Sequence, residues 1–507
     1  MEIKADIVIV GGGAAGLTAA VTAAERGCTV ALLEANYDLG GAAILSAGAM
    51  LIGGGHSVQG EFDVTDSPDR VWTDWTTHRH LQGRYNDRDL VRTFADASVE
   101  TVEFLRASGV DFETLPPRRG LDSVAARPQA REWHDPAGIV IKGQNGSGLT
   151  RALERRAREL GVRFLLQHRM RKLLADGERR VTGVEADLVD RDFNPTGAIV
   201  TVIAYRAVLL ATGGITGDVA FRSLFDPRLT AEYQQVGQSW SLRRADGHRA
   251  ALALGAAICG TASQTNEASA QLSKGRMGTR DNYHRIGFTP ESSCFFRAKA
   301  TGHLIRDWSN AILVKENGGR FYREDVDDRD YDYLNAAMAW NGNPDKLNGG
   351  GVIWAILDAD GLRREGVEPR PPSVDTDGYF FQADSLEELA TLTSRNPFQG
   401  MRMDGRALME TVERYNAAVR AGHDREFGKT ALDHQIVTAP FYAAWHTPVC
   451  HDTYVGLRTD LEGRVRDFSG EVIPGLFAAG EVQGGFGQHG LGRAIVFGRL
   501  AACAATT

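Results

Sequence analysis

Several features that mark membrane, secreted or metal-binding proteins are missing from the sequence. No stretch approaches the about 20 consecutive apolar residues of a membrane-spanning helix. An apolar strand begins almost at Met1, where a secretory leader would otherwise stand. Only five cysteines occur, at scattered positions, and neither C-x-x-C nor H-E-x-x-H is present. These absences predict a cytoplasmic protein with reduced thiols, no membrane span and no metal site.

An excess of positive charge is missing as well. The 57 Lys and Arg residues are outnumbered by 65 Asp and Glu residues, which gives a formal net charge of −8. A nucleic-acid-binding protein would show the opposite balance, so we expect no nucleic-acid partner. The length of 507 residues exceeds the roughly 250–300 residues at which a single core stops growing, which favours more than one domain.

Glycine is abundant, and its first cluster organises the N-terminal part of the chain. Residues 7–10 read Ile-Val-Ile-Val, which is typical of a buried parallel strand, and residues 11–16 read Gly-Gly-Gly-Ala-Ala-Gly. An Ala-rich helical stretch follows at Leu17–Arg26, and a second apolar strand at Thr29–Leu33 ends on Glu34. This is the dinucleotide fingerprint G-x-G-x-x-G in its required context of strand, turn and helix.

Each part of the fingerprint has a physical role. Gly11 allows the tight turn, Gly13 lets the backbone approach a pyrophosphate, and Gly16 lets helix and strand pack closely. The N–H groups at the start of the helix favour the phosphate charge. Glu34 is placed to accept a hydrogen bond from a ribose hydroxyl.

Further glycine pairs indicate which dinucleotide is bound. Gly40–Gly41 and the Ser46–Gly48 turn follow the acid and suit a second close approach by a flat, bulky cofactor, whereas a nicotinamide domain normally continues into another strand–helix unit. An apolar strand at Val208–Leu210 breaks into Ala211–Gly214, and a late strand ends at Gly475–Glu481.

Other local signals predict helix starts and a hairpin. Ser67–Pro68 has the order of a cap followed by proline, and Asn86 or Asp87 can cap a helix that runs to Ser108. The segments Arg180–Leu188 and Ala198–Tyr205 indicate an antiparallel hairpin.

In this order the glycine segments resemble the FAD-dependent family of fumarate reductase and succinate dehydrogenase flavoproteins and 3-ketosteroid dehydrogenases. The resemblance implies an α/β fold, with a Rossmann-like FAD-binding domain around a parallel sheet and an inserted α+β capping domain. The FAD-binding domain would take residues 1–275 and 440–507, and the capping or substrate domain residues 276–439. No His follows the first glycine pair, where succinate dehydrogenases attach flavin, so we expect non-covalent FAD.

The resemblance also implies where FAD is held. Met170 would contact adenine through its backbone, Glu481 would accept a ribityl hydroxyl, and the N–H groups of Ala494 and Ile495 would face the flavin O2 at a helix start. Asp246 either caps a helix or lies beside the flavin. The expected FAD-binding residues are Gly11, Gly13, Ala15, Gly16, Glu34, Ala35, Gly40, Gly41, Ser46, Ala47, Gly48, Met170, Ala211, Thr212, Gly213, Gly214, Gly480, Glu481, Arg493, Ala494 and Ile495.

Flavin chemistry at a C–C bond also needs one positioned acid or base. Arg329, between two aspartates, resembles the family's proton-donating Arg, although the same charge run could be a solvated face. Tyr331 and Tyr333 are alternative acids, since the ketosteroid branch uses Tyr. 

Negative charge that develops on a substrate oxygen has to be stabilised. His451 resembles a family His that binds a carboxylate or carbonyl, but its motif is shifted and Tyr454 stands where the family has small residues. Gly490 replaces the family's carboxylate-clamping Arg, and His489 or Arg493 would have to compensate. Fumarate itself is therefore disfavoured as the substrate.

Together these features predict an FAD-dependent dehydrogenase or reductase that acts on a CH–CH bond next to a carbonyl or carboxylate of a small molecule. The alternatives are a flavin oxidase or hydroxylase that acts on another bond, and a non-catalytic electron-transfer flavoprotein. No C-x-x-C-H haem motif is present, so the electron donor or acceptor would be external.

Overall fold

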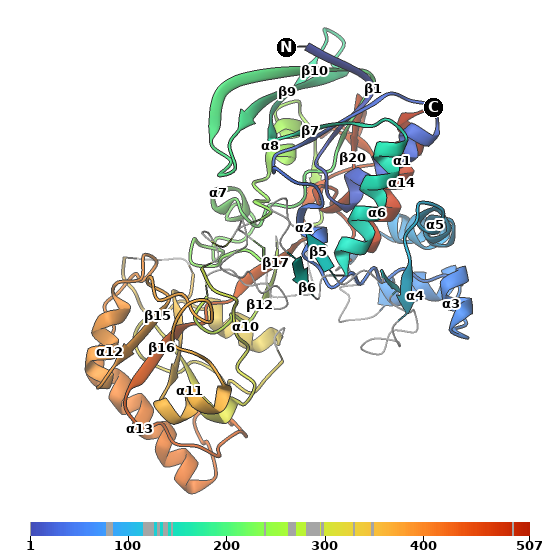
Figure 1. The fold of residues 1–507 in the computed structure, drawn as a ribbon. Coiled ribbons are helices and arrows are strands. Elements are labelled where there is room, and N and C mark those ends of the chain that lie inside the picture. Colours follow the sequence, from blue (N-terminus) through green and yellow to red (C-terminus); the bar gives the residue numbers. More distant parts are fainter. Residues whose placement is uncertain are drawn as a thin grey trace. The chain divides into compact units, whose positions relative to one another are not determined.

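The computed structural model describes residues 2–77, 85–114, 126–128, 132–134, 140–142, 145–237, 240–261, 270–279, 295, 299–327, 330–345, 349–488 and 491–507. The chain divides into two compact units (Figure 1). The first unit comprises Met1–Asp218, Trp240–Ala270 and Asp452–Thr507, and the second comprises Val219–Ser239 and Gln271–His451. The chain therefore leaves the first unit and returns to it. The assignment of residues 1–275 with 440–507 to FAD and of 276–439 to a cap stays a prediction.

The first unit is built on an eight-stranded sheet. Its path is β19-β20-β10-β1-β2-β7, and β9 and β8 are added next to β10. The pairs that β1 makes with β10 and β2, and those of β10 with β20 and β2 with β7, are parallel, as predicted. The strands are β1 (Glu2–Val10), β2 (Val30–Glu34), β7 (Arg163–Leu166), β8 (His168–Ala175), β9 (Val181–Val189), β10 (Pro195–Leu210), β19 (Arg464–Arg466) and β20 (Val472–Ala478).

The strands of this sheet are apolar on both faces, so both faces have to be covered. Helices cover one of them. Ile7 and Ile9 point into the core shared with the helices, where Leu17 of α1 is also fully buried. Helices α1, α6 and α14 lie together on this side (Figure 1). The helices of the first unit are α1 (Ala14–Glu25), α2 (Gly41–Ile44), α3 (Ser57–Glu61), α4 (Pro68–Thr77), α5 (Arg88–Ala107), α6 (Gly146–Glu159), α8 (Asp246–Leu252), the 3-10 turn η4 (Gly480–Val482) and α14 (Gly492–Ala505).

The predicted helix starts are confirmed. Helix α4 begins at Pro68, and the Asp87 carboxylate caps α5 by accepting from the N–H groups of Asp89 (2.9 Å) and Leu90 (3.1 Å). Helix α1 ends as glycine allows, because Gly27 has a φ of +81° and its N–H donates to the Ala24 carbonyl (3.0 Å).

A meander and a short helix cover the other face. Strands β8, β9 and β10 pair antiparallel in sequence, which confirms the predicted hairpin. Val8 and Val184 share this second core with Ala250 of α8. The prediction of Asp246 as a cap is wrong: Ala245 precedes the helix at a φ of +58°, and the Asp246 carboxylate instead binds Arg169 (2.7 and 2.9 Å).

The second unit contains a four-stranded antiparallel sheet in the order β13-β14-β16-β15. Trp354 and Trp445 pack edge to face in its fully buried core (centroids 6.2 Å apart). Its elements are α7 (Val219–Arg222), η3 (Trp308–Asn310), β13 (Ile312–Lys315), α10 (Tyr331–Met338), β14 (Ile353–Leu357), α11 (Ala359–Glu365), β15 (Phe380–Ala383), α12 (Leu386–Thr393), α13 (Gly405–Ala421) and β16 (Phe441–Trp445). Strands β12 (Ala270–Ser273) and β17 (Val449–Thr453) include the points at which the chain passes from one unit to the other. The remaining short strands of the chain are β3 (Phe112–Thr114), β4 (Ala126–Pro128), β5 (Glu132–His134), β6 (Val140–Lys142), β11 (Ile258–Cys259) and β18 (Gly456–Leu457).

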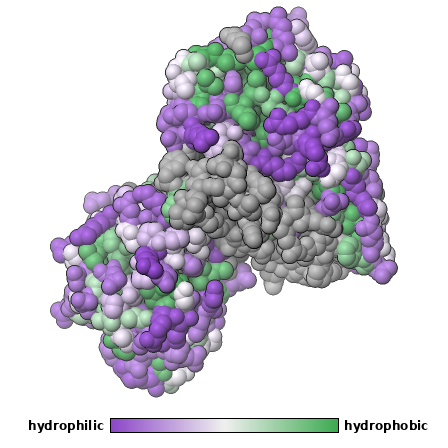
Figure 2. All heavy atoms as spheres, viewed as in Figure 1, coloured by the Kyte–Doolittle hydropathy of each residue, from purple (hydrophilic) through white to green (hydrophobic). Residues whose placement is uncertain are grey.

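Hydrophilic residues cover much of the face drawn in Figure 2, and hydrophobic residues gather there in smaller patches. Across the part of the chain that the structure describes, no helix has the length and apolar character needed to cross a membrane.

Candidate functional site

The glycine turn between β1 and α1 brings three backbone segments into contact. Gly11 has a φ of +106°, and its N–H donates to the Leu33 carbonyl (2.8 Å). A Cβ at Gly11 would lie 2.3 Å from the Ala211 carbonyl oxygen, and a Cβ at Gly16 would lie 1.8 Å from the Gly11 oxygen. Both positions therefore require glycine, as the fingerprint predicts.

The next part of the turn is open and lined by N–H groups. The nearest atom to a Cβ at Gly13 is the Gly40 carbonyl oxygen, at 3.9 Å. Leu17 is the first residue of α1 whose N–H reaches an acceptor at the start of the helix, the Gly13 carbonyl (2.9 Å). The N–H groups of Ala15 and Gly16 precede it, and together with the helix dipole they can bind a phosphate.

The second glycine pair packs on the first turn. Gly40 and Gly41 have φ values of +111° and +49°, and the Gly40 N–H donates to the Gly12 carbonyl (2.8 Å). Ser46 Oγ accepts from the Gly48 N–H (3.1 Å), which closes the small turn around Ala47.

The acid at the end of β2 is bound to this backbone. Glu34 accepts from the N–H of Gly12 (2.7 Å) and from the N–H of Asn36 (2.8 Å), the residue that follows Ala35. Burial raises the pKa of Glu34 although these hydrogen bonds oppose the shift. A carboxylate has about four acceptor sites, so the predicted bond from a ribose hydroxyl is compatible with the backbone contacts from Gly12, Ala35 and Asn36.

Besides the glycine turn at Gly11–Gly16, which we call the first glycine cradle, a second glycine cradle is formed by Gly213 and Gly214 where β10 and β20 end. A Cβ at Gly214 would lie 2.0 Å from Thr453 Oγ1 and 3.1 Å from Glu481 Oε2. Gly213 has a φ of +73°, and the Thr212 hydroxyl is buried with no hydrogen-bond partner among the described residues. A buried hydroxyl of this kind is costly unless a ligand or water completes it.

The start of α14 is joined to the same region. A Cβ at Gly480 would lie 3.1 Å from Ala15 Cβ and 3.7 Å from Ala494 Cβ. The Ile495 N–H donates to the Leu491 carbonyl (3.1 Å) inside the helix, and Ala494 lies one residue earlier. Of the two predicted flavin donors, Ala494 is therefore the one that precedes the helix ladder.

Arg493 is a buried organiser of this turn. Its guanidinium donates to the carbonyl oxygens of Phe486 and of Thr453, the latter at 2.8 Å. The backbone N–H of Arg493 donates to Gln488 Oε1 (2.5 Å). Only 3% of Arg493 is exposed. Its predicted roles toward substrate and FAD stay predictions.

These features together fit a dinucleotide. The turn around Gly11 and Gly13 offers backbone N–H groups to a pyrophosphate, Glu34 and Glu481 offer carboxylates to hydroxyls, and Thr212 offers a hydroxyl that has no partner in the described part of the chain. Met170 is buried in the core of the meander opposite Ala186, which leaves its backbone as the part that could face adenine.

The predicted catalytic residues are described only in part. Arg329 and His489 lie outside the described residues. Tyr331 is the first residue of α10 and is 51% exposed, whereas Tyr454 is 4% exposed and its ring would lie 3.1 Å from a Cβ at Gly487. His451 is half-buried in β17. Their roles stay predictions.

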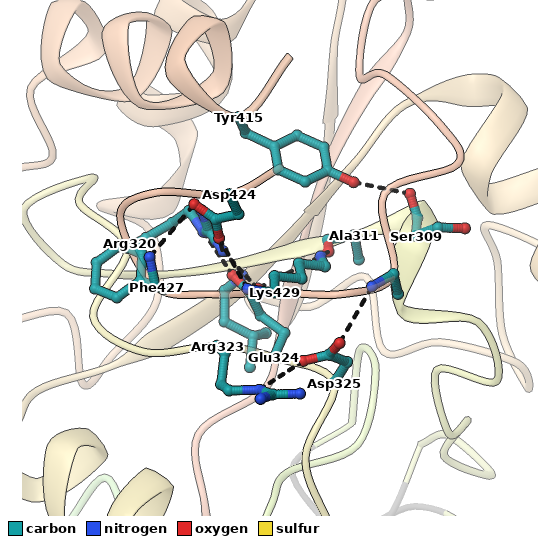
Figure 3. Close-up of polar contacts among 12 residues, drawn as sticks. Ser309, Ala311, Arg320, Arg323, Glu324, Asp325, Tyr415, Asp424, Phe427 and Lys429 are labelled. Atoms are coloured by element: carbon teal, nitrogen blue, oxygen red, sulfur yellow. Dashed lines mark hydrogen bonds and ion pairs between the residues drawn. The ribbon is translucent and has the colours of Figure 1, made fainter. Parts of the chain in front are cut away.

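The sequence analysis missed a buried charge cluster in the second unit, formed by Arg320, Glu324, Asp424 and Lys429 (Figure 3). Arg320 binds the Glu324 carboxylate through two nitrogens (2.8 and 2.9 Å) and Asp424 at 3.0 Å. Lys429 Nζ lies 3.4 Å from Glu324 and donates to the Ala311 carbonyl (2.6 Å). Burial alone would raise the pKa of Glu324, but Lys429 and Arg320 outweigh burial and hold that pKa below its ordinary value.

Lys274 holds the chain that follows this charge cluster. Its ammonium donates to the carbonyl oxygens of Glu324 (2.6 Å) and Val326 (2.7 Å) and lies 4.5 Å from the Trp308 ring centroid. These contacts fix the backbone at Glu324 and Val326. No local pattern marks Lys274 for this role, because its acceptors lie about fifty positions away in the sequence.

The family described as "FAD binding domain" matches residues 6–494 of the chain. The chain belongs to this FAD-binding family. FAD is therefore its cofactor, in agreement with the two glycine cradles of the first unit.

Several curated relatives match nearly the whole chain. Three of them are the NADH:acrylate oxidoreductase of Vibrio harveyi (27% identical, covering 99% of this chain and 50% of the relative), the urocanate reductase of Eggerthella lenta (26%, 98% and 73%) and the cytochrome fumarate reductase of Shewanella frigidimarina (27%, 98% and 76%). The chain thus spans half the length of the first of these relatives.

Solved structures show the same fold. The open conformation of a flavocytochrome c3 fumarate reductase superposes with a TM-score of 0.68 at 23% identity, over 99% of this chain and 78% of the other. The 3-ketosteroid delta1-dehydrogenase of Sterolibacterium denitrificans superposes with a TM-score of 0.67 at 19% identity, over 99% of each chain. The predicted family resemblance is confirmed.

Proposed function

We propose that this chain is an FAD-dependent oxidoreductase that acts on a CH–CH bond next to a carbonyl or carboxylate. The observation that carries the proposal is the match, over 98–99% of this chain, to relatives named for reactions of acrylate, urocanate and fumarate. All three compounds are unsaturated carboxylates. When bound, FAD supplies the acceptor or donor of the hydride.

The chain's own residues would divide the remaining tasks. The turn around Gly11 and Gly13 binds the pyrophosphate of a dissociable FAD. The carboxylate of Glu34 orients the ribose of FAD, and that of Glu481 orients the ribityl chain. One of the four candidates moves the proton to or from the neighbouring carbon. These candidates are Arg329, Tyr331, Tyr454 and His451.

The substrate we propose is a small carbonyl compound or carboxylate other than fumarate, because Gly490 stands where the resembling enzymes carry a clamping Arg. Electrons would come from, or pass to, a separate donor or acceptor. The scattered cysteines support a cytoplasmic location.

An anaerobic titration of the purified holoprotein tests the proposal in the visible flavin band. Saturated cyclic ketones and keto acids are added to the oxidised protein, and acrylate-like enoates to the dithionite-reduced protein. Bleaching in the first arm identifies a dehydrogenase, and return of the yellow colour in the second arm identifies a reductase. A yellow protein that responds in neither arm would overturn the assignment to CH–CH bonds.

Substitution separates proton transfer from cofactor binding. We expect Arg329→Gln to slow the productive arm at least about 100-fold, which is the ordinary contribution of a general acid or base, with an unchanged flavin spectrum. Arg323→Gln is the matched control, because Arg323 lies in the same charged stretch but pairs with Asp325 (2.9 Å). Equal rates in the two variants would remove Arg329 and leave Tyr331, Tyr454 and His451, to be tested as Tyr→Phe and His→Gln.

A further inference from the structure

The segment from Trp240 to Leu252 packs against the glycine cradle at the end of β10. The Gly217 N–H donates to the Arg243 carbonyl (3.0 Å), which ties the segment to the loop after the cradle. A Cβ at Gly247 would lie 2.3 Å from Thr212 Oγ1. The segment therefore contacts the cradle at two points, one of them the buried Thr212 hydroxyl, which has no hydrogen-bond partner among the residues that the structure describes.

Arg243 reaches the same cradle with its side chain. A Cβ at Gly213 would lie 3.4 Å from Arg243 Cγ, 4.0 Å from Arg243 Cδ and 4.0 Å from Glu481 Oε2. The stem of Arg243 and the carboxylate of Glu481 thus approach one glycine. Only 7% of Arg243 is exposed, so its charge is held inside the unit.

The backbone at Arg243 is strained. Arg243 has a φ of +41° and Ala245 a φ of +58°, a region that residues other than glycine rarely adopt. Such strain persists where the surrounding structure imposes it, and it gathers at ligand sites. The strain therefore supports a functional reason for the position of this side chain.

The side chain of Arg243 ends in a guanidinium, which is a cationic group. Arg493 also brings a guanidinium to this region, where it donates to two backbone carbonyls. Arg243 and Glu481 both approach Gly213, and the predicted partner of Glu481 is the ribityl chain. Glu34, the predicted partner of the ribose, is not among the atoms near Gly213. A positive charge at this position would therefore lie on the side of Glu481, the predicted partner of the ribityl chain.

We infer that Arg243 is a further FAD-binding residue, which places positive charge beside the flavin half and stabilises reduced FAD more than oxidised FAD. The buried guanidinium and the negative charge gained on reduction attract each other across a medium of low dielectric constant. This inference concerns the cofactor alone and holds whatever the substrate is.

The test measures cofactor binding and potential rather than turnover. We expect Arg243→Gln to raise the Kd of reduced FAD about tenfold more than the Kd of oxidised FAD. For a two-electron couple this ratio lowers the midpoint potential by about 30 mV. Arg243→Lys keeps the charge, so its potential should stay within about 10 mV of the parent, a shift of about twofold in the same ratio.

Arg249→Gln is the matched control. Arg249 lies in helix α8, which follows Arg243 in the chain; it pairs with Asp218 (2.8 Å) and has a 51% exposed side chain, so its charge is screened by solvent. An unchanged potential in Arg243→Gln, or one equal to that of Arg249→Gln, would overturn the inference. Equal weakening of both redox forms would do the same, because it would place Arg243 at the pyrophosphate. If Arg243→Gln takes up no FAD, the midpoint potentials of Arg243→Lys and Arg243→Met are compared instead. A parent-like potential in Arg243→Lys alone supports a charge effect, and equal potentials in these two variants overturn the inference.

Discussion

The glycine turn of the first unit and the charge cluster of the second unit accommodate polar groups by different means. The turn uses backbone: the conformation at Gly11, the contact of Gly16 with Gly11, and the N–H groups at the start of α1. The second unit uses side chains: Arg320, Glu324 and their partners form ion pairs with 1–2% of each side chain exposed.

This difference determines which changes each unit tolerates. A backbone site fails when a Cβ is added, because the atoms it would meet are carbonyl oxygens that cannot rotate away. A buried ion cluster fails when one charge is removed, because its partner stays buried without compensation. Substitutions in the two units should therefore be damaging for opposite reasons.

The largest effect is expected for Gly16→Val. The first added atom would lie 1.8 Å from the Gly11 carbonyl oxygen, so α1 and β1 cannot keep their contact. We expect a loss of more than about 4 kcal/mol in the free energy of unfolding and no FAD in the purified protein, measured by denaturant unfolding and by absorbance. Gly60→Ala in α3 is the control, since a Cβ there meets nothing within 4 Å. A yellow, stable Gly16→Val protein would contradict the backbone account.

In the second unit, Glu324→Gln should lower the free energy of unfolding by about 3–5 kcal/mol, because Arg320 and Lys429 lose their shared anion. Glu410→Gln tests the same chemistry at the surface, where the Arg406–Glu410 pair has side chains 83% and 58% exposed. There we expect less than about 1 kcal/mol. Equal losses in the two variants would mean that burial does not set the strength of the cluster.

A pH dependence of stability of intermediate size is expected from His446, whose ring centroid lies 5.5 Å from that of Trp308. Burial, with Lys274 and Arg276 nearby, lowers the pKa of His446 from 6.5 to about 3. As pH falls below 6.5 the unfolded chain binds a proton that the folded chain does not, so stability falls. Between pH 8 and pH 5 the loss from this group is about 2 kcal/mol.

His446→Phe should remove that part of the pH dependence and leave stability at pH 8 equal or higher, since neither ring nitrogen of His446 has a hydrogen-bond partner among the described residues. Urea unfolding at pH 5 and pH 8 measures this. The exposed His423 serves as the control, and His423→Gln should keep the full pH dependence. A slope unchanged by His446→Phe would show that His446 is protonated in the folded protein.

The smallest effects compare matched helix caps. Asp87 caps α5 in the first unit with two N–H groups, and Asp404 caps α13 in the second with one (2.9 Å, from Arg406). Replacing either by Ala should cost about 1 kcal/mol, with Asp87→Ala the larger in thermal unfolding. A larger loss for Asp404→Ala would indicate that the second unit depends on its caps more than its buried charges suggest.

The features that sequence predicted are those set by neighbours in the chain. The glycine turn at Gly11–Gly16, the cap at Asp87 and the hairpin of β9 and β10 each depend on a short stretch, and the structure confirms them. Asp246 was predicted wrongly because its partner, Arg169, lies 77 positions away and draws the carboxylate from the cap position.

Long-range partners account for what the sequence did not show. Lys429 meets the Ala311 carbonyl 118 positions away, and Arg320 meets Asp424 104 positions away. Arg243 meets Gly213 only after the segment around α8 packs on the end of β10. Side chains of this kind carry no local signal, whereas a required glycine does.

The order of the segments also has a consequence for synthesis. Strand β10 pairs with β20 through Val208 and Leu476, and the whole second unit lies between these two positions in the sequence. A ribosome adds about 5–20 residues per second, so the pairing edge of β10 waits on the order of tens of seconds for its partner. During that interval an apolar strand edge is open to wrong pairing. Chaperone dependence should therefore be concentrated in this interval and end when β20 leaves the ribosome.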